Sequence, residues 1–326
     1  PGNVTIAGQS AGGGSVMSQM ACMDNEGLFH RAVVMSAMIR SPYQVGGIGV
    51  PEELWHAEEN GQHFLSFLGC STIEQARKLD AATIRDKYEE YTKIFPAMFT
   101  VLDHKFCVGD PMVLFMEGKH VNVPVMSGNT SDEFPSYIEA SSKEDLKKKA
   151  EEIFGKNAET FLRFPEAMRE DSDGKYAKVN GIECTIKCLF SDKKSAGEKK
   201  PYYYYRFDSD IPGWDNAGTF HSVDLWFFFE TLAKCWRPFV GQHYDLSRMM
   251  CNYWVNFIKT GDPNGNDADG KPMPYWYPYE KEKPCEMIFM SDRPVVNCGW
   301  VTPFKEFLQE QIKKTLSIGK IFHKEW

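Results

Sequence analysis

Residues that could do chemistry stand near the start of the chain, where the run Gly8–Gly12 (GQSAG) directly follows the apolar run Val4–Ala7 (VTIA). A G-x-S-x-G run between a β-branched segment and a helix-forming segment is typical of a nucleophile elbow, a sharp turn that projects a serine hydroxyl clear of a sheet. Glycines on both sides remove Cβ atoms that would collide where strand and helix approach closely. We therefore predict that Ser10 is a nucleophile; an ordinary Gly/Ser turn is the alternative.

A serine hydroxyl becomes a good nucleophile when a nearby histidine takes its proton and a carboxylate fixes the tautomer of that histidine. After a nucleophile elbow, the acid comes next in the chain and the histidine last. His221 fits the last position because it lies in the small-residue loop Gly218–Ser222, shortly after the aromatic run Tyr202–Phe207. Such a loop lets an imidazole reach over the end of a sheet. A loop histidine without a catalytic role is the alternative.

Two carboxylates are candidates for the acid. Asp132 and Glu133 both end the polar turn that follows the apolar run Val121–Gly128. Spacing does not separate them. Either could complete a triad with Ser10 and His221, and the other would then be solvated or bind backbone.

The elements that must position these residues alternate between strands and helices. Short apolar or aromatic runs predict buried strands at 4–7, 30–36, 121–128 and 202–207, with short strands near 287–289. Helical spacing and charge patterns predict helices that include 53–68, 74–91, 142–154, 246–259 and 303–316. This order predicts an α/β fold with a mostly parallel central sheet and flanking helices. We expect a single domain over residues 1–326, with helical insertions at about 41–95 and 141–190. Such a sheet needs several strands before its nucleophile strand, so the sequence indicates the C-terminal portion of an α/β-hydrolase domain whose N-terminal strands are missing.

The composition of the chain excludes some classes of binding partner. The 326 residues are 42% hydrophobic and 14% aromatic, as expected of a globular protein with a sizeable core. The net charge of −8 argues against nucleic acid, and no apolar stretch is long enough for a membrane-spanning helix. The nine cysteines are widely scattered, which predicts buried free thiols and favours a reducing compartment. Cys184 and Cys188 lack further ligands nearby and no H-E-x-x-H motif occurs, so neither a metal nor a cofactor is expected.

Five motifs resemble the type-B carboxylesterase/cholinesterase family. They are Gly8–Gly13, Gly27–Ser36, Val123–Glu133, Phe220–Trp226 and Tyr253–Asn264, in the order that the family has. The resemblance covers almost the whole chain. It implies an α/β-hydrolase fold, a Ser10–His221–Glu133 triad and an oxyanion hole to which the Ala11 N–H contributes. It thereby selects Glu133 rather than Asp132 as the acid.

The chain departs from the family pattern in three places. Phe134 stands where the family usually has glycine after the acid, so this loop is expected to take a different backbone path. Cys70 lacks the partner that closes a small disulfide loop in secreted animal members. This favours a cytoplasmic enzyme similar in character to bacterial para-nitrobenzyl-esterase-like carboxylesterases. The family's glycine-rich oxyanion loop would lie upstream of Pro1, so an N-terminal portion of the same enzyme, attached or as a separate chain, is an expected partner.

The leading hypothesis is a serine carboxylesterase that hydrolyses small-molecule carboxylic esters through an acyl-enzyme intermediate. The alternatives are a catalytically inactive fragment and a cholinesterase-like binding module without catalysis. Bulky apolar side chains are candidates for the substrate pocket and favour aromatic or medium-length acyl esters, although each is also a candidate core residue. They are Phe95, Met98, Phe99, Trp214, Phe220 and Trp226.

Overall fold

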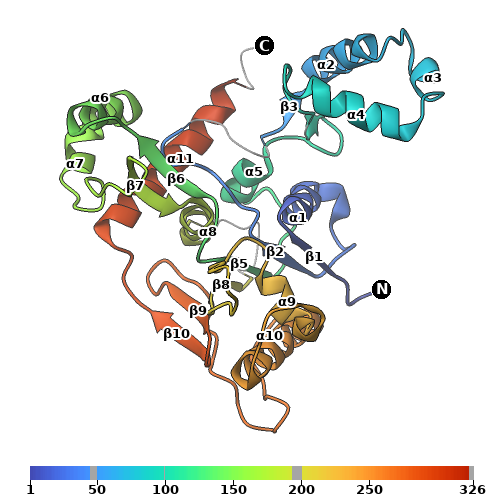
Figure 1. Ribbon diagram of the computed structural model, residues 1–326. Coiled ribbons are helices and arrows are strands. Elements are labelled where there is room, and N and C mark those ends of the chain that lie inside the picture. The colour runs from blue at the N-terminus through green and yellow to red at the C-terminus, as the bar shows by residue number, and fades with distance from the viewer. Residues whose placement is uncertain (45–49, 99, 193–199, 323–326) are drawn as a thin grey trace. The chain divides into compact units, whose positions relative to one another are not determined.

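The computed structural model describes residues 1–44, 50–98, 100–192 and 200–322 (Figure 1). Backbone contacts divide the chain into two compact units, which are described separately. One comprises Pro1–Ile48 and Pro111–Trp326, and the other comprises Gly49–Asp110. No helix among the described residues is long and apolar enough to cross a membrane.

A six-stranded sheet forms the centre of the first unit. Its strand order is β1 (Thr5–Gln9), β2 (Arg31–Met35), β5 (Val125–Thr130), β8 (Tyr202–Asp208), β9 (Cys285–Met290) and β10 (Pro294–Cys298). The first five strands are parallel, and β10 pairs antiparallel with β9. The prediction of an α/β fold with a mostly parallel sheet is therefore confirmed.

Consecutive side chains of these strands enter two hydrophobic cores, one on each face of the sheet. Tyr202 and Tyr204 lie in one core, whereas Tyr203, Tyr205 and Phe207 lie in the other. Both faces of a parallel sheet are covered, so the strand has no solvent-facing position for alternating polar residues. This explains why the strand sequences are continuous apolar or aromatic runs.

Helices cover both faces. The core that contains Tyr202 also contains side chains of α1 (Ala11–Ala21), α5 (Pro111–Glu117), α8 (Gly181–Ser191) and α11 (Pro303–Phe322). The opposite core contains side chains of α9 (Asp224–Phe228) and α10 (Gly241–Thr260), which lie side by side in Figure 1. Two 3₁₀ turns, η1 (Met23–Asn25) and η3 (Leu232–Lys234), follow α1 and α9. Helix α1, which follows Ser10, and the segment that follows His221 therefore lie on opposite faces of the sheet.

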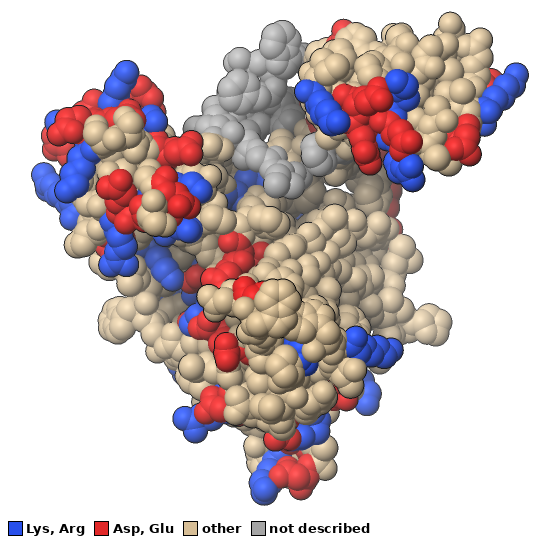
Figure 2. All heavy atoms as spheres, in the orientation of Figure 1, with Lys and Arg blue, Asp and Glu red and all other residues tan. Residues whose placement is uncertain are grey.

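A smaller antiparallel pair, β6 (Pro135–Glu139) and β7 (Lys175–Asn180), follows the loop that holds Glu133. Between its strands lie α6 (Lys143–Phe154), the 3₁₀ turn η2 (Gly155–Asn157) and α7 (Ala158–Leu162). Figure 2 shows acidic and basic side chains mixed over the surface of α6 and α7. The insertion expected to be helical at about 141–190 thus contains a strand, because β7 pairs with residues some forty positions away, and a local pattern does not indicate such pairing.

The second unit is mostly helical. It contains α2 (Leu54–Phe67), α3 (Ile73–Ala76) and α4 (Ala81–Tyr91) with a short parallel pair, β3 (Glu52–Glu53) and β4 (Val101–Leu102). Tyr91 is fully buried, and its ring stacks on Phe95 with centroids 4.6 Å apart. The Tyr91 hydroxyl donates to Asn60. Aromatic packing therefore gives these helices a small core of their own.

The cysteines differ from the prediction of buried free thiols in two respects. Cys285 on β9 and Cys298 on β10 form a disulfide, and of the seven free cysteines Cys235 and Cys251 are only half-buried. The two residues are direct cross-strand partners with Cα atoms 4.1 Å apart. The prediction of free thiols is wrong for this pair, because the spacing of the cysteines in the sequence does not reveal the β9–β10 hairpin that brings the two residues together. Burial raises the pKa of the Cys184 and Cys188 thiols to about 12, as expected of inert core cysteines.

Candidate active site

Ser10 forms the turn between β1 and α1 with a strained backbone. Its φ of 56° and ψ of −124° lie outside the regions that residues with a side chain prefer. The Ser10 N–H donates to the Met35 carbonyl at 2.9 Å, which ties the turn to the end of β2. A non-glycine residue held in such a conformation fits the sharp turn of a nucleophile elbow.

Two glycines allow this turn, and one of them was not expected. A Cβ at Gly8 would lie 2.2 Å from the Gly12 carbonyl oxygen, and a Cβ at Gly13 would lie 2.5 Å from the Ala37 Cβ. A Cβ at Gly12 would meet nothing within 4 Å. The close approach of strand and helix therefore requires glycine at positions 8 and 13, whereas the sequence pattern had assigned the second crowded position to Gly12.

Glu133 contacts the imidazole of His221. Glu133 Oε2 lies 2.7 Å from His221 Nδ1, and its side chain is fully buried. The other carboxylate oxygen, Oε1, accepts from the Thr130 N–H at 3.2 Å. The loop that follows β5 therefore holds a carboxylate with one oxygen on the backbone and the other on the histidine.

Asp132 has a different set of contacts. Its Oδ2 accepts from the Thr219 N–H at 2.8 Å and from the Thr219 hydroxyl at 3.1 Å. Gly218, with a φ of 63°, lies so close that a Cβ there would be 2.4 Å from Asp132 Oδ2. Asp132 therefore joins the acid loop to the loop that carries His221, while Glu133 reaches the imidazole itself.

The second ring nitrogen of His221 is occupied by Gln9. His221 Nε2 lies 3.2 Å from the side-chain nitrogen of Gln9, at the end of β1. Because a carboxylate only accepts, the proton on the imidazole lies on Nδ1, and Nε2 accepts from the Gln9 amide. Within the described residues, no hydrogen bond joins Ser10 Oγ to His221. Ser10, Glu133 and His221 therefore lie near one another, but the serine hydroxyl is not hydrogen-bonded to the imidazole.

Phe134 covers one side of the same imidazole. Its ring centroid lies 4.7 Å from that of His221, and the phenyl side chain is 52% exposed. The residue that departs from the family pattern therefore lies against the candidate base. Sequence analysis missed the contacts of both Gln9 and Phe134 with His221, since Gln9 is 212 positions away from the histidine.

Ala11 is the first residue of α1 and is exposed. The first N–H groups of a helix have no acceptor within the helix, and the helix dipole adds partial positive charge there. The Ala11 N–H next to Ser10 is therefore suited to bind a developing oxyanion.

A second buried carboxyl group, Asp224, lies near Glu133 and His221. Burial, reinforced by the charge of Glu133, raises its pKa from 3.8 to about 6. The Tyr205 hydroxyl donates to its Oδ2 at 2.8 Å, and Oδ1 is buried without a hydrogen-bond partner among the described residues. The sequence signal for this group was an acidic residue within the apolar segment that follows His221.

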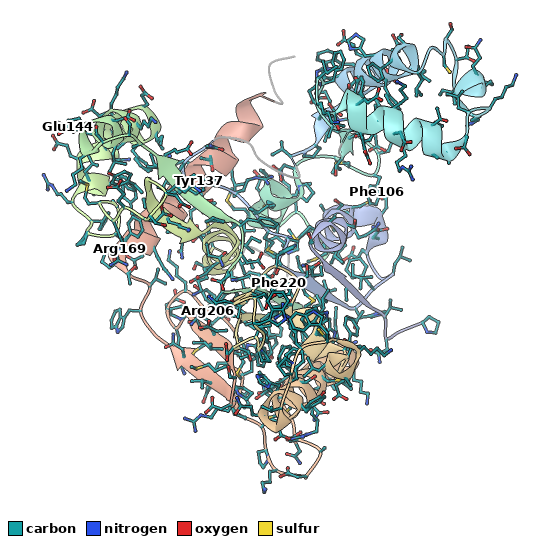
Figure 3. The ribbon with its side chains drawn as sticks, in the orientation of Figure 1. Phe106, Tyr137, Glu144, Arg169, Arg206 and Phe220 are labelled. Carbon is teal, nitrogen blue, oxygen red and sulfur yellow. A yellow bond between two sulfur atoms is a disulfide. The ribbon has the colours of Figure 1, made fainter. Side chains whose placement is uncertain are left out.

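The six predicted pocket residues do not all lie in one place. Phe220, labelled in Figure 3, packs against Trp226 with centroids 5.6 Å apart, and Trp214 packs against Trp236 at 5.8 Å. Phe95 and Met98 belong to the Gly49–Asp110 unit. Phe99 lies outside the described residues. The first unit therefore brings together the three aromatic residues from the segment around His221.

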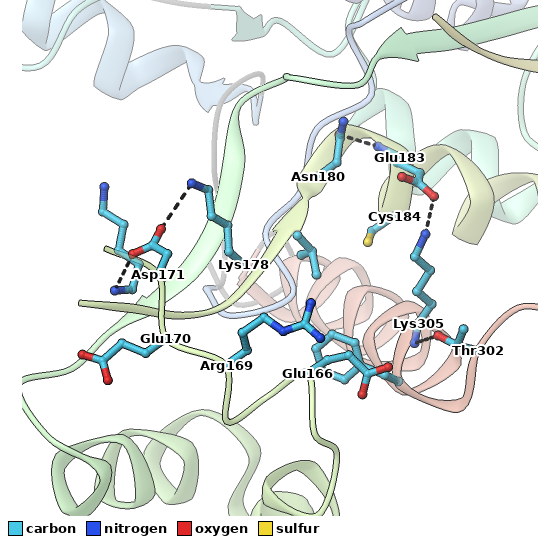
Figure 4. A pocket seen from close by; sticks show the side chains of 13 residues that line it. Glu166, Arg169, Glu170, Asp171, Lys178, Asn180, Glu183, Cys184, Thr302 and Lys305 are labelled. Carbon is cyan, nitrogen blue, oxygen red and sulfur yellow. Dashed lines mark hydrogen bonds and ion pairs between the residues drawn. The ribbon is translucent and has the colours of Figure 1, made fainter. Parts of the chain in front are cut away.

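A cavity of about 640 Å³ between β7, α8 and the start of α11 contains none of the triad residues. Figure 4 shows that charged side chains on its walls pair with one another: Lys178 with Asp171 at 3.2 Å, and Lys305 with Glu183 at 2.6 Å. Lys187 bonds Glu183 as well, and these two cations hold the pKa of the buried Glu183 at about 2. The charges of these residues are balanced within the ion pairs, and none of these residues offers a group that could hydrolyse an ester.

Comparison with known proteins identifies the family to which the chain is similar. The carboxylesterase family model matches residues 1–295. Bile salt-activated lipase of Rattus norvegicus is 26% identical over 326 aligned residues, which cover 86% of this chain and 51% of the lipase. Para-nitrobenzyl esterase of Bacillus subtilis (strain 168) is 25% identical, with 91% of this chain and 60% of the esterase covered.

A solved structure of a PNB esterase has the same fold, with a TM-score of 0.65 at 24% identity. The match covers 94% of this chain and 64% of that chain. The chain spans about half the length of the bile salt-activated lipase that it matches. Together with the family match over most of the sequence, these findings confirm the resemblance: the chain belongs to the carboxylesterase family.

Proposed function

We propose that this chain carries the catalytic residues of a serine carboxylesterase that acts through an acyl-enzyme intermediate. The observation that carries the proposal is the 2.7 Å contact between Glu133 and His221 beside the strained turn of Ser10. Nδ1 of the imidazole is bound to a buried carboxylate, so Nε2 is the basic nitrogen. The family match supports ester hydrolysis as the reaction class.

In the proposed mechanism, His221 Nε2 takes the proton of Ser10 Oγ as the oxygen attacks the ester carbonyl. The Ala11 N–H donates to the oxyanion of the tetrahedral intermediate. The imidazolium then protonates the leaving alcohol, and the C–O bond to the alcohol breaks to give the acyl-enzyme. Water attacks the acyl group in the same way, which releases the acid and restores Ser10. The Gln9 amide must leave Nε2 before the first step, because one lone pair cannot accept from both groups.

We further propose that the complete active site needs a segment that precedes β1, as part of one α/β-hydrolase domain. Among the described strands, β1 pairs with β2 only, so its outer edge is open to a further strand. Bile salt-activated lipase of Rattus norvegicus is about twice as long as its matched part, which supports a longer protein. Ala11 supplies one oxyanion donor, and we expect the preceding segment to supply another. A cytoplasmic location stays a prediction, and the Cys285–Cys298 disulfide does not favour it.

A fluorophosphonate probe tests the proposal directly. It reacts covalently with an activated serine, so mass spectrometry of the labelled protein should locate the adduct on Ser10. Ser10→Ala should abolish labelling. A non-catalytic binding module, whose serine is not activated, would leave Ser10 unlabelled at probe concentrations that label a relative such as the para-nitrobenzyl esterase of Bacillus subtilis.

A further inference from the structure

We propose that Phe134 is a positioning residue, which holds the imidazole of His221 in the orientation that proton transfer requires. Phe134 stands where the family usually has glycine, so its contact with the imidazole is not part of the family pattern. The inference rests on the proposed esterase function and adds a residue on which that function depends. Phe134 acts through His221 and takes no part in the bond changes.

The hydrogen bonds of the imidazole do not fix its orientation at every step. The ring turns about the bond between Cβ and Cγ, a torsion with a broad range of values. In the resting structure, Nδ1 lies 2.7 Å from Glu133 Oε2, and Nε2 lies 3.2 Å from the Gln9 amide nitrogen. The proposed mechanism removes the second contact, because Gln9 must leave Nε2 before Ser10 can donate to it. Of these two hydrogen bonds, the one to Glu133 is then left to restrain the ring.

The phenyl ring of Phe134 supplies a restraint that does not use a ring nitrogen. Its centroid lies 4.7 Å from that of the imidazole, and the two ring planes are inclined by 50°. This separation lies within the range in which aromatic rings contact each other. It also lies within about 6 Å, the distance over which a phenyl ring attracts a cation through its face. The contact can therefore persist when Gln9 leaves and when the neutral imidazole becomes an imidazolium.

The backbone around Phe134 sets the position of the phenyl group. On one side, the Thr130 N–H donates to Glu133 Oε1 at 3.2 Å. On the other side, Pro135 begins β6 and is paired with Asn180 on β7. A residue that precedes proline is restricted to extended conformations. The side chain of Phe134 therefore projects from a segment that is held at both ends before a substrate arrives.

Phe134 belongs to neither hydrophobic core of the first unit. It is 52% exposed, whereas the side chains of His221 and Glu133 are 22% and 0% exposed. A half-exposed phenyl group whose ring lies against the candidate base is placed for the site rather than for the core. Its removal should leave the fold intact, so substitution can test the proposal.

Two substitutions at this position separate the contact from the rest of the protein. Phe134→Ala removes the phenyl group, whereas Phe134→Leu keeps an apolar side chain that can still touch the imidazole. The measured quantities are kcat and KM for p-nitrophenyl acetate in the enzyme that includes the preceding segment. Phe134→Ala should lower kcat by about ten- to a hundredfold, because a misplacement of about 1 Å in a reacting group costs up to about a hundredfold. KM should not change, since the phenyl group holds the base rather than the ester. Phe134→Leu should retain most of the kcat.

Two further variants complete the comparison. Phe134→Gly, with the residue that is usual in the family, should lose kcat as Phe134→Ala does. Phe229→Ala is the matched control, because Phe229 is also exposed, at 64%, and its ring contacts that of Trp254 at a centroid distance of 5.7 Å. This control should leave kcat unchanged, since its ring contact is with a residue outside the proposed triad. The thermal midpoint of each variant shows whether the fold is retained.

Nuclear magnetic resonance reports the orientation of the imidazole independently of turnover. Isotope-labelled histidine is incorporated, and the His221 signals are identified by their absence in His221→Gln. The ring signals should be sharp in the unsubstituted protein and in Phe134→Leu. They should broaden in Phe134→Ala, because the ring then samples more than one orientation. A residue with a purely structural role would not broaden these signals at an unchanged thermal midpoint.

The outcomes separate this inference from the proposed function. Unchanged kcat and sharp His221 signals in Phe134→Ala would overturn the positioning role, and so would equal losses of kcat in Phe134→Ala and Phe134→Leu. A raised KM at unchanged kcat would show that Phe134 binds the ester instead, which also overturns the inference. Fluorophosphonate labelling of Ser10 in the unsubstituted protein tests the esterase function by itself. Without labelling the esterase proposal fails, whereas the His221 signals still show whether Phe134 holds the ring.

Discussion

Replacing Glu133 by Gln should place the proton of His221 on the wrong nitrogen. Both oxygens of Glu133 accept hydrogen bonds, Oε1 from the Thr130 N–H and Oε2 from His221 Nδ1. A glutamine has one acceptor and one donor. If its oxygen faces Thr130, its NH₂ group faces Nδ1, which must then accept, and the imidazole proton moves to Nε2. That tautomer cannot take the proton of Ser10.

The opposite orientation of the amide keeps the active tautomer but is disfavoured. Its NH₂ group would face the buried Thr130 N–H, and two donors would be left without acceptors. Such a defect costs about 1–3 kcal/mol, so the active arrangement becomes roughly 5- to 150-fold less populated. Loss of the charge that stabilises the imidazolium removes about 1.5–3 kcal/mol more, or roughly another 10- to 150-fold. We therefore expect turnover to fall by about 50- to 2 × 10⁴-fold, a range that includes the roughly 10⁴-fold effect of the corresponding acid-to-amide change in another triad.

Asp132→Asn is the matched control. Its amide oxygen can still accept from both the Thr219 N–H and the Thr219 hydroxyl, as Asp132 Oδ2 does, so the loss of turnover should stay below about tenfold. Rates are measured with p-nitrophenyl acetate in the longer enzyme proposed above. Nitrogen chemical shifts of His221 report the tautomer independently of turnover. Full activity of Glu133→Gln, or a larger loss for Asp132→Asn, would refute the assignment.

Four further changes test other parts of the structure. Ser10→Ala should lower p-nitrophenyl acetate turnover by several orders of magnitude without changing the thermal midpoint by more than a few degrees, and near-native turnover would exclude Ser10 as the nucleophile. Gly13→Ala should destabilise the fold by about 1–3 kcal/mol in urea unfolding because of the Ala37 contact, whereas Gly14→Ala, which meets nothing within 4 Å, should be neutral or stabilise by up to about 1 kcal/mol. Asp224→Asn should stabilise the fold by up to about 3 kcal/mol more at pH 7.5 than at pH 4. The pKa of Asp224 in the native state, about 6, lies above its ordinary value, so the native state binds more protons than the unfolded state. The free energy of unfolding of the native protein therefore falls as pH rises from about 4 through 6. The chain without a preceding segment should hydrolyse p-nitrophenyl acetate about 10²- to 10³-fold more slowly than with one, since one oxyanion donor is worth that factor; equal rates would contradict the proposal.

The sheet and the turn at Ser10 could be predicted because their signals are local. Continuous apolar runs marked β2, β5 and β8, and the G-x-S-x-G run marked the turn at Ser10. The ends of the elements were less accurate. The predicted strand 121–128 begins at Val125 and continues to Thr130, because its length depends on pairing with β8 rather than on its own sequence.

The contacts around His221 could not be predicted in the same way. Asp132 and Glu133 are adjacent and chemically alike, and only the position of Thr219, in a loop 87 residues away, gives them different partners. Resemblance to a family favoured Glu133, but it supplied no physical reason. Gln9 was missed because its importance lies in a contact with a loop far away in the sequence.

The environment of each carboxyl group near His221 indicates what it contributes. Asp132 bonds the backbone and hydroxyl of Thr219, so its charge stabilises the loop rather than the imidazole. Glu133 is buried with one oxygen on His221, where its charge can balance an imidazolium. Asp224 is fully buried and accepts from a tyrosine hydroxyl, and burial, reinforced by the charge of Glu133, raises its pKa. Protonation of Asp224 below about pH 6 therefore removes a buried negative charge from the vicinity of Glu133 and His221. The proposed triad has a neighbouring carboxyl group whose charge changes near pH 6.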